Sequence, residues 1–155
     1  MRRFWIVCVL VTLSGPGFAE QARTWILDDN PEAPSLGFGA PDSDDLVIAI
    51  SCEPAAKRMT VVESIAAPKL NPGGTATFRL TAGTQSLDLS GDATANESDG
   101  AVSIEVNGAP NLRLFALLKA GPSLTIEVAD TKETIPLAAA AAHVPVLEKL
   151  CLGKK

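Results

Sequence analysis

The sequence contains few of the side chains from which catalytic and metal centres are usually built. It has one histidine, three cysteines and no tyrosine. The single histidine, His143, excludes metal sites made of several histidines and leaves a Ser-His-Asp relay with one possible base. No Gly-x-Ser-x-Gly segment presents a nucleophile, so a hydrolase that uses His143 or carboxylates is disfavoured. We predict that the protein is not an enzyme and that it carries no cofactor.

Aromatic side chains are also scarce, and the net charge has the wrong sign for nucleic-acid binding. Aromatic residues make up 5% of the chain, and beyond residue 19 they occur only at positions 25, 38, 78 and 115. Stacking platforms for sugars or bases are therefore not expected, and Trp25 is predicted to cover the core. The formal net charge of −5 argues against binding to phosphate backbones, which requires clustered lysine and arginine.

Residues 1–19 have the organisation of a secretory signal peptide. Two arginines precede an apolar run of about ten residues, and the small residues Gly17 and Ala19 fit a cleavage site. The alternative, a membrane anchor, would need roughly twenty apolar residues to cross a bilayer. We therefore predict cleavage before Glu20, a periplasmic or secreted location, no stable membrane span, and a single β-rich domain over 20–155. Loss of the two arginines would change the formal net charge from −5 to −7.

The cysteines are consistent with export to an oxidising compartment. Cys8 lies in the predicted signal peptide and would leave with it, so that Cys52 and Cys151 remain. Oxidising conditions favour a disulfide between these two residues, and two separate buried thiols are the alternative. Closing a loop of about 100 residues is worth about 4 to 5 kcal/mol in the chain-entropy model. Such a bridge would tie the strand that ends at Cys52 to the C-terminal end of the chain.

The segment 46–52 is predicted to be the central strand of the fold. It has no glycine, proline or charge, and Leu46, Ile48, Ile50 and Cys52 alternate onto one face. Eight further segments show strand character between turn signals: 24–27, 36–40, 59–65, 75–81, 84–90, 101–106, 123–129 and 134–137. Their spacing predicts an all-β domain, either an antiparallel sandwich or an open barrel of about seven to nine strands.

A short internal helix and two irregular segments complete the central part of the chain. Asn111 can cap a helix over 112–119, which ends before a glycine and a proline. Residues 20–23 are predicted to form a loose leader. The polar and acidic segment 91–100 contains no apolar residue larger than alanine, so it is predicted to be an exposed loop.

A second short helix is predicted at the C-terminal end. Val144, Leu147 and Cys151 recur at helical spacing and would form one apolar face. Pro145 is compatible with this helix only if the helix begins near 142–144, because proline is tolerated in the first turn. The helix would then pack on the sheet and be linked to the central strand through Cys151.

With Asp28, Asp29 and Glu32 earlier in the chain, the acids Asp42, Asp44 and Asp45 form a candidate calcium site. Carboxylate oxygens are suitable ligands for calcium, and these three acids share one turn before the central strand. The spacing lacks the Asp-x-Asp-x-Asp-Gly pattern and the bidentate glutamate of a calcium-binding loop. A solvated acidic turn is therefore favoured over a calcium site.

Several features together resemble small exported proteins of Gram-negative bacteria. They are Trp25, the segment 36–41 leading into a strand that ends at Cys52, the segment 117–125, and a terminal helix that closes on Cys151. This group is mostly uncharacterised and is distantly similar to the invasion-associated locus B family and to a type VI secretion accessory family, whose Arg-containing motifs are missing here. The resemblance implies a β-rich periplasmic domain without a known catalytic centre, and it transfers no functional residue.

The function expected from these observations is binding rather than catalysis. We predict a non-enzymatic periplasmic interaction protein whose partner is another envelope or secreted protein, with loops such as 28–45 and 91–100 offering surface to that partner. The alternatives are a structural envelope component without a discrete site and, less favoured, a hydrolase that uses carboxylates or His143.

Overall fold

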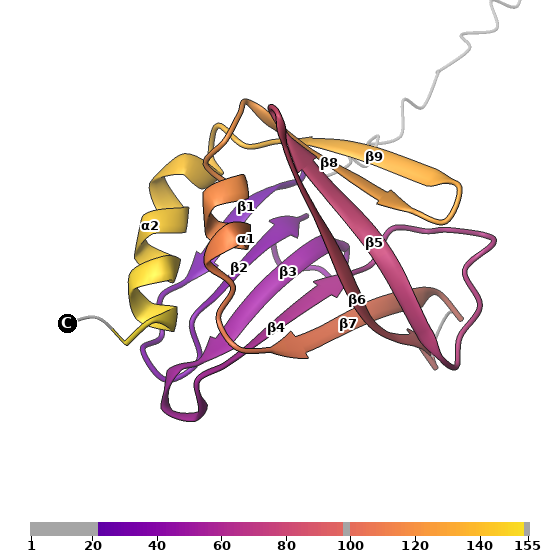
Figure 1. The fold of residues 1–155 in the computed structure, drawn as a ribbon, viewed down its shortest axis with the longest axis horizontal. Helices are drawn as coiled ribbons and strands as arrows, with labels where there is room; N and C mark the ends of the chain where they lie inside the picture. The colour runs from indigo at the N-terminus through magenta and orange to yellow at the C-terminus, as the bar shows by residue number, and fades with distance from the viewer. Residues whose placement is uncertain (1–21, 98–99, 154–155) are drawn as a thin grey trace, which may run out of the picture.

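The computed structural model describes residues 22–97 and 100–153, and the predicted signal peptide at 1–19 lies outside these ranges. The described residues form nine strands in one sheet, in the order β1-β2-β3-β4-β7-β6-β5-β8-β9, and neighbouring strands are antiparallel. The sheet curls into an open half-barrel with two short helices beside it (Figure 1). The prediction of an all-β domain with two short helices is confirmed, and of the two predicted architectures, sandwich and open barrel, the chain forms the open barrel.

The elements have the following bounds: β1 Thr24–Asp28, β2 Ser35–Gly39, β3 Leu46–Glu53, η1 Pro54–Ala56, β4 Arg58–Glu63, β5 Thr75–Ala82, β6 Gln85–Ala95, β7 Val102–Gly108, α1 Leu112–Leu117, β8 Ser123–Val128, β9 Thr131–Pro136 and α2 Ala140–Cys151.

The hairpin of β5 and β6 shows how local sequence signals form the sheet. Phe78 and Leu80 are fully buried, whereas Arg79 between them is exposed, as the alternation predicts. The chain reverses at Gly83, whose φ of 56° lies in the left-handed region that glycine adopts without strain. Gly73 has a φ of 84°, as expected for the residue that follows Pro72 in a type II turn.

The strand β6 is longer than the sequence predicts. The segment 91–100 is expected to be a loop, but β6 continues through 91–95 and pairs with β7. Ala93 is 3% exposed and lies opposite Ile104. Gly91 permits this close pairing, because a Cβ atom there would lie 2.0 Å from a carbonyl oxygen of β7. The loop prediction is therefore wrong for the first half of the segment, where small side chains pack against larger ones on the neighbouring strand.

The central strand β3 contains an irregularity that changes which residues face the core. Leu46 is expected to share a face with Ile48, Ile50 and Cys52, but it is 38% exposed while those three residues are buried. The register against β2 shifts, so that Phe38 pairs with Ile48 while Gly39 pairs with Leu46. The extra residue, Val47, is 2% exposed and takes the inward position instead. The prediction for Leu46 is thus wrong because a β-bulge interrupts the alternation of the strand.

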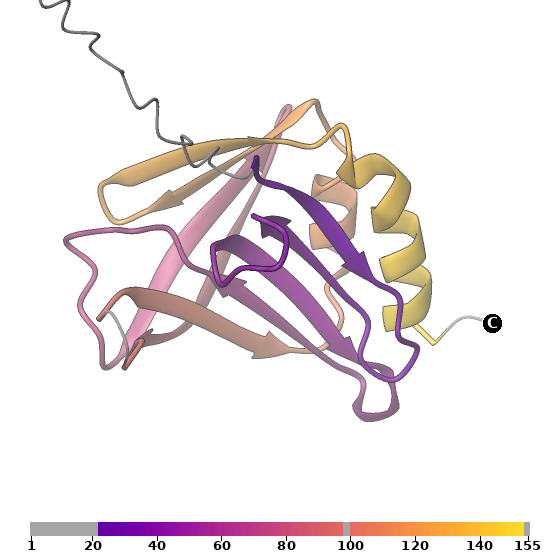
Figure 2. The ribbon, with the colours of Figure 1, turned by 180° about the vertical axis from the view of Figure 1, so that it is seen from behind.

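Both helices lie at the end of the half-barrel where the odd-numbered strands finish, which we call the helical end (Figures 1 and 2). The side chain of Asn111 accepts hydrogen bonds from the N–H groups of Arg113 and Leu114, at 3.0 and 3.4 Å, so the predicted cap of α1 is confirmed. The packed face of α2 consists of Ala140, Val144, Leu147 and Cys151, which are all buried.

The start of α2 differs from the prediction. The helix begins at Ala140, and Pro145 therefore lies in its second turn rather than its first. The expected start near 142–144 is wrong by one half-turn or more. Proline at this position removes the N–H that would bond to the carbonyl of Ala141. Both residues are exposed, so water can satisfy that carbonyl while the opposite face of the helix stays packed.

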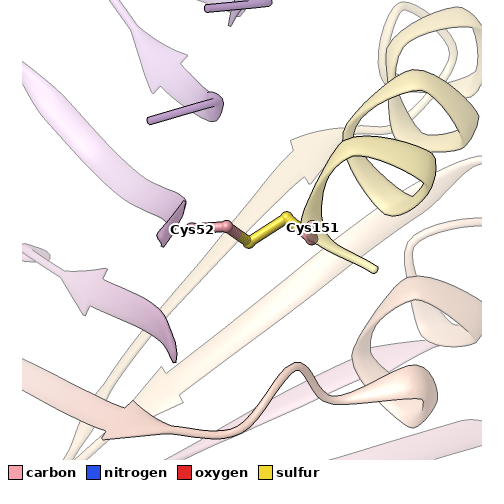
Figure 3. The surroundings of a disulfide bond; sticks show 2 residues. All are labelled: Cys52 and Cys151. Carbon is pink, nitrogen blue, oxygen red and sulfur yellow. A yellow bond between two sulfur atoms is a disulfide. The ribbon is translucent and has the colours of Figure 1, made fainter. Parts of the chain in front are cut away.

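The predicted disulfide joins the sheet to the C-terminal helix. Cys52 near the end of β3 and Cys151 at the end of α2 are bonded, with their Cα atoms 5.4 Å apart (Figure 3). Both residues are buried, and the bridge spans a sequence separation of 99. The helical end is therefore held by packing and by a covalent link.

The two edge strands, β1 and β9, face each other across a gap that we call the seam. Because seven strands lie between them and every neighbouring pair is antiparallel, β1 and β9 run in the same direction. The indole N–H of Trp25 donates to the carbonyl of Pro136 at 2.6 Å, and Arg23 reaches Glu133 at 3.1 Å. Trp25 is 4% exposed, so its predicted role in covering the core is confirmed.

Candidate functional site

The end of the half-barrel opposite the helices, which we call the open end, carries the candidate site. Here β1, β3 and β9 begin and β4 finishes. A cleft of about 360 Å³, the seam cleft, is lined by Arg23, Asp45, Leu46, Val47, Ser64, Ile65, Ala66, Thr131, Lys132 and Glu133. A neighbouring cleft of about 420 Å³, the loop cleft, is lined by Asp44, Asp45, Leu46, Ser64, Asn96, Ala101, Val102 and Ser103. The two clefts share the wall formed by Asp45, Leu46 and Ser64.

Arg23 links three parts of the chain at the open end. Its guanidinium donates two hydrogen bonds of 2.8 Å to the carboxylate of Asp45 and one of 3.1 Å to Glu133. The hydrogen bond from Arg23 holds the pKa of Asp45 below its ordinary value. These side chains are 30% to 47% exposed, so each ion pair contributes little to stability. Their consequence is geometric, because they fix the start of β1 against the turn before β3 and against β9.

Glu63 is the buried charged residue of the open end. It is 0% exposed and lies on the inner face of β4, directly opposite Ile48 on one side and Ile104 on the other. The inner row that contains it runs across six strands and is otherwise apolar: Trp25, Phe38, Ile48, Glu63, Ile104 and Ala93. A carboxyl group in such a row is removed from water on both sides.

The two carboxyl oxygens of Glu63 have different surroundings. One oxygen, Oε1, accepts a hydrogen bond from the backbone N–H of Ile65. The other, Oε2, is buried and has no hydrogen-bond partner among the residues that the structure describes. Burial raises the pKa of Glu63 to about 7, opposed by the Ile65 N–H and assisted by the negative charge of Glu133. The side chain therefore exchanges its proton near neutral pH.

The position of the Glu63 carboxyl follows from its hydrogen bond. Ile65 lies two residues beyond the end of β4 and lines the seam cleft, as does Glu133. The Glu63 carboxyl therefore lies beside Ile65 and close enough to Glu133 to be affected by its charge. Glu63 does not itself line the seam cleft, but its hydrogen-bond partner Ile65 does, so the buried carboxyl lies behind the cleft wall.

The predicted calcium residues are placed on the turn beside these clefts. Asp44 and Asp45 line the loop cleft, but the carboxylate of Asp45 is engaged by Arg23. Asp42 adopts a φ of 55° in the same turn. Among residues 22–97 and 100–153, no group of three or more His, Cys, Asp or Glu side chains converges to hold a metal ion.

His143 lies far from the acids of the open end. It is half-buried in the first turn of α2, at the helical end, whereas Asp45, Glu63 and Glu133 lie at the opposite end of the sheet. The structure therefore does not bring His143 and these carboxylates together into the relay that a hydrolase would need.

The sequence analysis did not identify two charged residues at the open end, Arg23 and Glu63, as candidate site residues. Arg23 is expected to belong to a loose leader, but it bonds to Asp45 and Glu133. Glu63 is not singled out by the sequence analysis, although a signal is present. Met59, Val61 and Ile65 fall on the apolar face of the strand at period two, and Glu63 occupies the same face. A charged residue in register with core positions is uncommon and could have been identified.

Comparison with protein-family models, curated proteins and solved structures gave no match to this chain. In the part of the chain that the structure describes, neither helix has the length and apolar character needed to cross a bilayer.

Proposed function

We propose that this protein is an exported, non-enzymatic binding protein that recognises another envelope or secreted protein at its open end. The observation that carries the proposal is the difference between the two ends of the half-barrel. The helical end is covered by packed helices and closed by a disulfide, whereas the open end has two adjoining clefts and, behind the wall of one of them, a buried carboxyl group with one oxygen that has no hydrogen-bond partner among the described residues. Unsatisfied buried polar groups are rare in folded proteins, and a functional role is one of the reasons for which they occur.

The compartment in this proposal is supported by the disulfide between Cys52 and Cys151. Disulfides persist in the periplasm and outside the cell and are rare in reducing compartments. The signal peptide expected at residues 1–19 would direct the chain to such a compartment. The resemblance to small exported proteins of Gram-negative bacteria points the same way.

Binding is preferred over catalysis because of what surrounds Glu63. Its neighbours across the sheet are Ile48 and Ile104, and His143 is at the other end of the molecule. A general acid or base needs a second polar group that positions or attacks a substrate. Glu63 accepts its hydrogen bond from a backbone N–H and not from a side chain that could act on a substrate, so we propose that its carboxyl forms a charged or hydrogen-bonded contact with a partner.

Site-specific photo-crosslinking in the cell that exports the protein tests this proposal. A photoreactive phenylalanine analogue at Ser64, an exposed residue in the wall shared by both clefts, should give a crosslinked species of one discrete higher mass. The matched control is the same analogue at Ala141, which is exposed on α2 at the helical end. Crosslinks from Ala141 but none from Ser64 would place the interaction elsewhere.

Two further outcomes would favour the alternative functions. Absence of a discrete crosslink at both positions would favour a structural envelope component without a site. Turnover in a hydrolase substrate screen that is lost in His143→Ala would show that the protein is an enzyme.

A further inference from the structure

Glu63 has one oxygen available for a ligand and one that is already occupied. Oε1 accepts from the N–H of Ile65, while Oε2 has no partner in the described part of the chain. The carboxyl lies behind the wall of the seam cleft at Ile65, and the volume of that cleft, about 360 Å³, is within the range of small-ligand pockets. A group that enters this cleft could therefore complete the hydrogen bonding of Glu63.

The charges around the cleft show what kind of group is missing. The charged residues that line it are Arg23 ahead of β1, Asp45 ahead of β3, and Lys132 and Glu133 of β9. From β3 and β7, Glu63 is faced by isoleucines. The positive charges of Arg23 and Lys132 balance the negative charges of Asp45 and Glu133. Ionised Glu63 therefore adds one negative charge that has no positive counterpart among the residues of the cleft. Lys132 also pairs with Glu127 outside the cleft, which makes the deficit of positive charge larger.

The geometry of the free oxygen distinguishes between the possible cations. A guanidinium binds a carboxylate best through two parallel hydrogen bonds, as Arg23 does with Asp45. Only Oε2 of Glu63 is without a partner, so a guanidinium bound through two hydrogen bonds would have to share Oε1 with the Ile65 N–H. An ammonium group is a compact charge that needs only one strong acceptor. A metal ion is less suitable, since the described residues provide no set of three converging ligands.

We infer that the seam cleft is a site for a single alkylammonium group, supplied by a lysine side chain of the protein partner, which bonds to Oε2 of Glu63. Oε2 is covered in the free protein, so the lysine must displace part of the cleft wall, in which Ser64, next to Glu63 in the chain, is exposed. Ionised Glu63 binds the ammonium, and a protonated Glu63 does not. The assignment of the ammonium group to a lysine of a protein partner rests on the proposed function. The inference that the cleft binds an ammonium group does not.

The probe for this site is n-butylammonium chloride, which has the length and charge of a lysine side chain. The protein, ¹³C- and ¹⁵N-labelled and with its disulfide intact, is titrated with the probe while the Glu63 carboxyl and Ile65 amide signals are followed by NMR. With the pKa of Glu63 at about 7, the ionised fraction increases about tenfold between pH 6 and pH 8. The apparent dissociation constant should therefore be about tenfold lower at pH 8, since only the ionised form binds.

Three comparisons decide the result. Glu63→Gln should lose both the binding and its pH dependence, while Glu32→Gln, which alters an exposed carboxylate in the loop before β2, should retain both. n-Butanol, which has the same chain without charge, should cause no saturable shift of Ile65. Equal binding of n-butanol, unchanged binding by Glu63→Gln, or tighter binding of n-butylguanidinium would each overturn the inference.

The outcome is separable from that of the crosslinking experiment. If Ser64 crosslinks to a protein but n-butylammonium does not bind, the cation site is wrong and the binding function stands. If n-butylammonium binds as described but no partner is crosslinked, the cation site stands and its assignment to a partner's lysine is wrong.

Discussion

Replacing Glu63 by glutamine should make the protein more stable at alkaline pH. The folded protein raises the pKa of Glu63 from 4.5 to about 7, mainly by burial. Below pH 4.5 the residue is protonated in both the folded and the unfolded state, so it adds no pH dependence. Between pH 4.5 and about 7 the unfolded chain loses the proton while the folded protein keeps it, so stability falls as the pH rises.

The magnitude follows from the size of the change in pKa. At 1.36 kcal/mol for each pKa unit, the cost of ionising Glu63 in the folded protein is on the order of 3 kcal/mol once the pH exceeds about 7. Glutamine keeps an oxygen that accepts from the N–H of Ile65 and carries no charge at any pH. The variant should therefore gain, relative to the wild type, on the order of 2 to 3 kcal/mol between pH 5 and pH 8.

Urea unfolding at pH 5, 6, 7 and 8 measures this gain. The free energy of unfolding of the wild type should decrease across the series, and that of Glu63→Gln should decrease much less. Glu32→Gln, at an exposed position, is the matched control and should follow the wild type. Parallel curves for wild type and Glu63→Gln would refute the reasoning, because they would show that Glu63 is not a buried acid that ionises near neutral pH.

Three further predictions concern the disulfide and the residues that the sequence offers as candidate sites. Replacing Cys52 and Cys151 together by alanine should lower the free energy of unfolding, measured in urea, by about 2 to 5 kcal/mol, because the unfolded chain gains conformational entropy without the bridge. The unreduced wild type should show no alkylatable thiol beyond residue 19. Two such thiols would contradict the bridge. Millimolar calcium should raise the melting temperature very little, since Asp45 is engaged by Arg23 and no three ligands converge in the described residues. A rise of many degrees that disappears in Asp44→Asn with Asp45→Asn would instead establish a calcium site. His143→Ala should leave crosslinking from Ser64 unchanged, because the two residues lie at opposite ends of the sheet; loss of the crosslink would link His143 to partner binding.

The sequence alone determined the features that depend on neighbours along the chain. Alternation of apolar and polar residues predicted the strands, as Phe78 and Leu80 show by their complete burial. Asn111 predicted the start of α1, and Gly73 predicted a turn, because caps and turns are formed by a few consecutive residues. The number of strands and the all-β class followed from the repetition of such local signals.

The tertiary structure decided the features that depend on pairing between distant segments. Placing β4 next to β7 buries Glu63 beside Ile104, and no periodicity within either strand specifies that neighbour. The bulge in β3 turns Val47 inward because of its register against β2, which is a property of the pair and not of one strand. Arg23 acquires its role only because curling of the sheet brings β9 to the start of β1. The candidate site at the open end is thus a product of the sheet order and its curvature, since its residues come from segments that meet only after the half-barrel has formed.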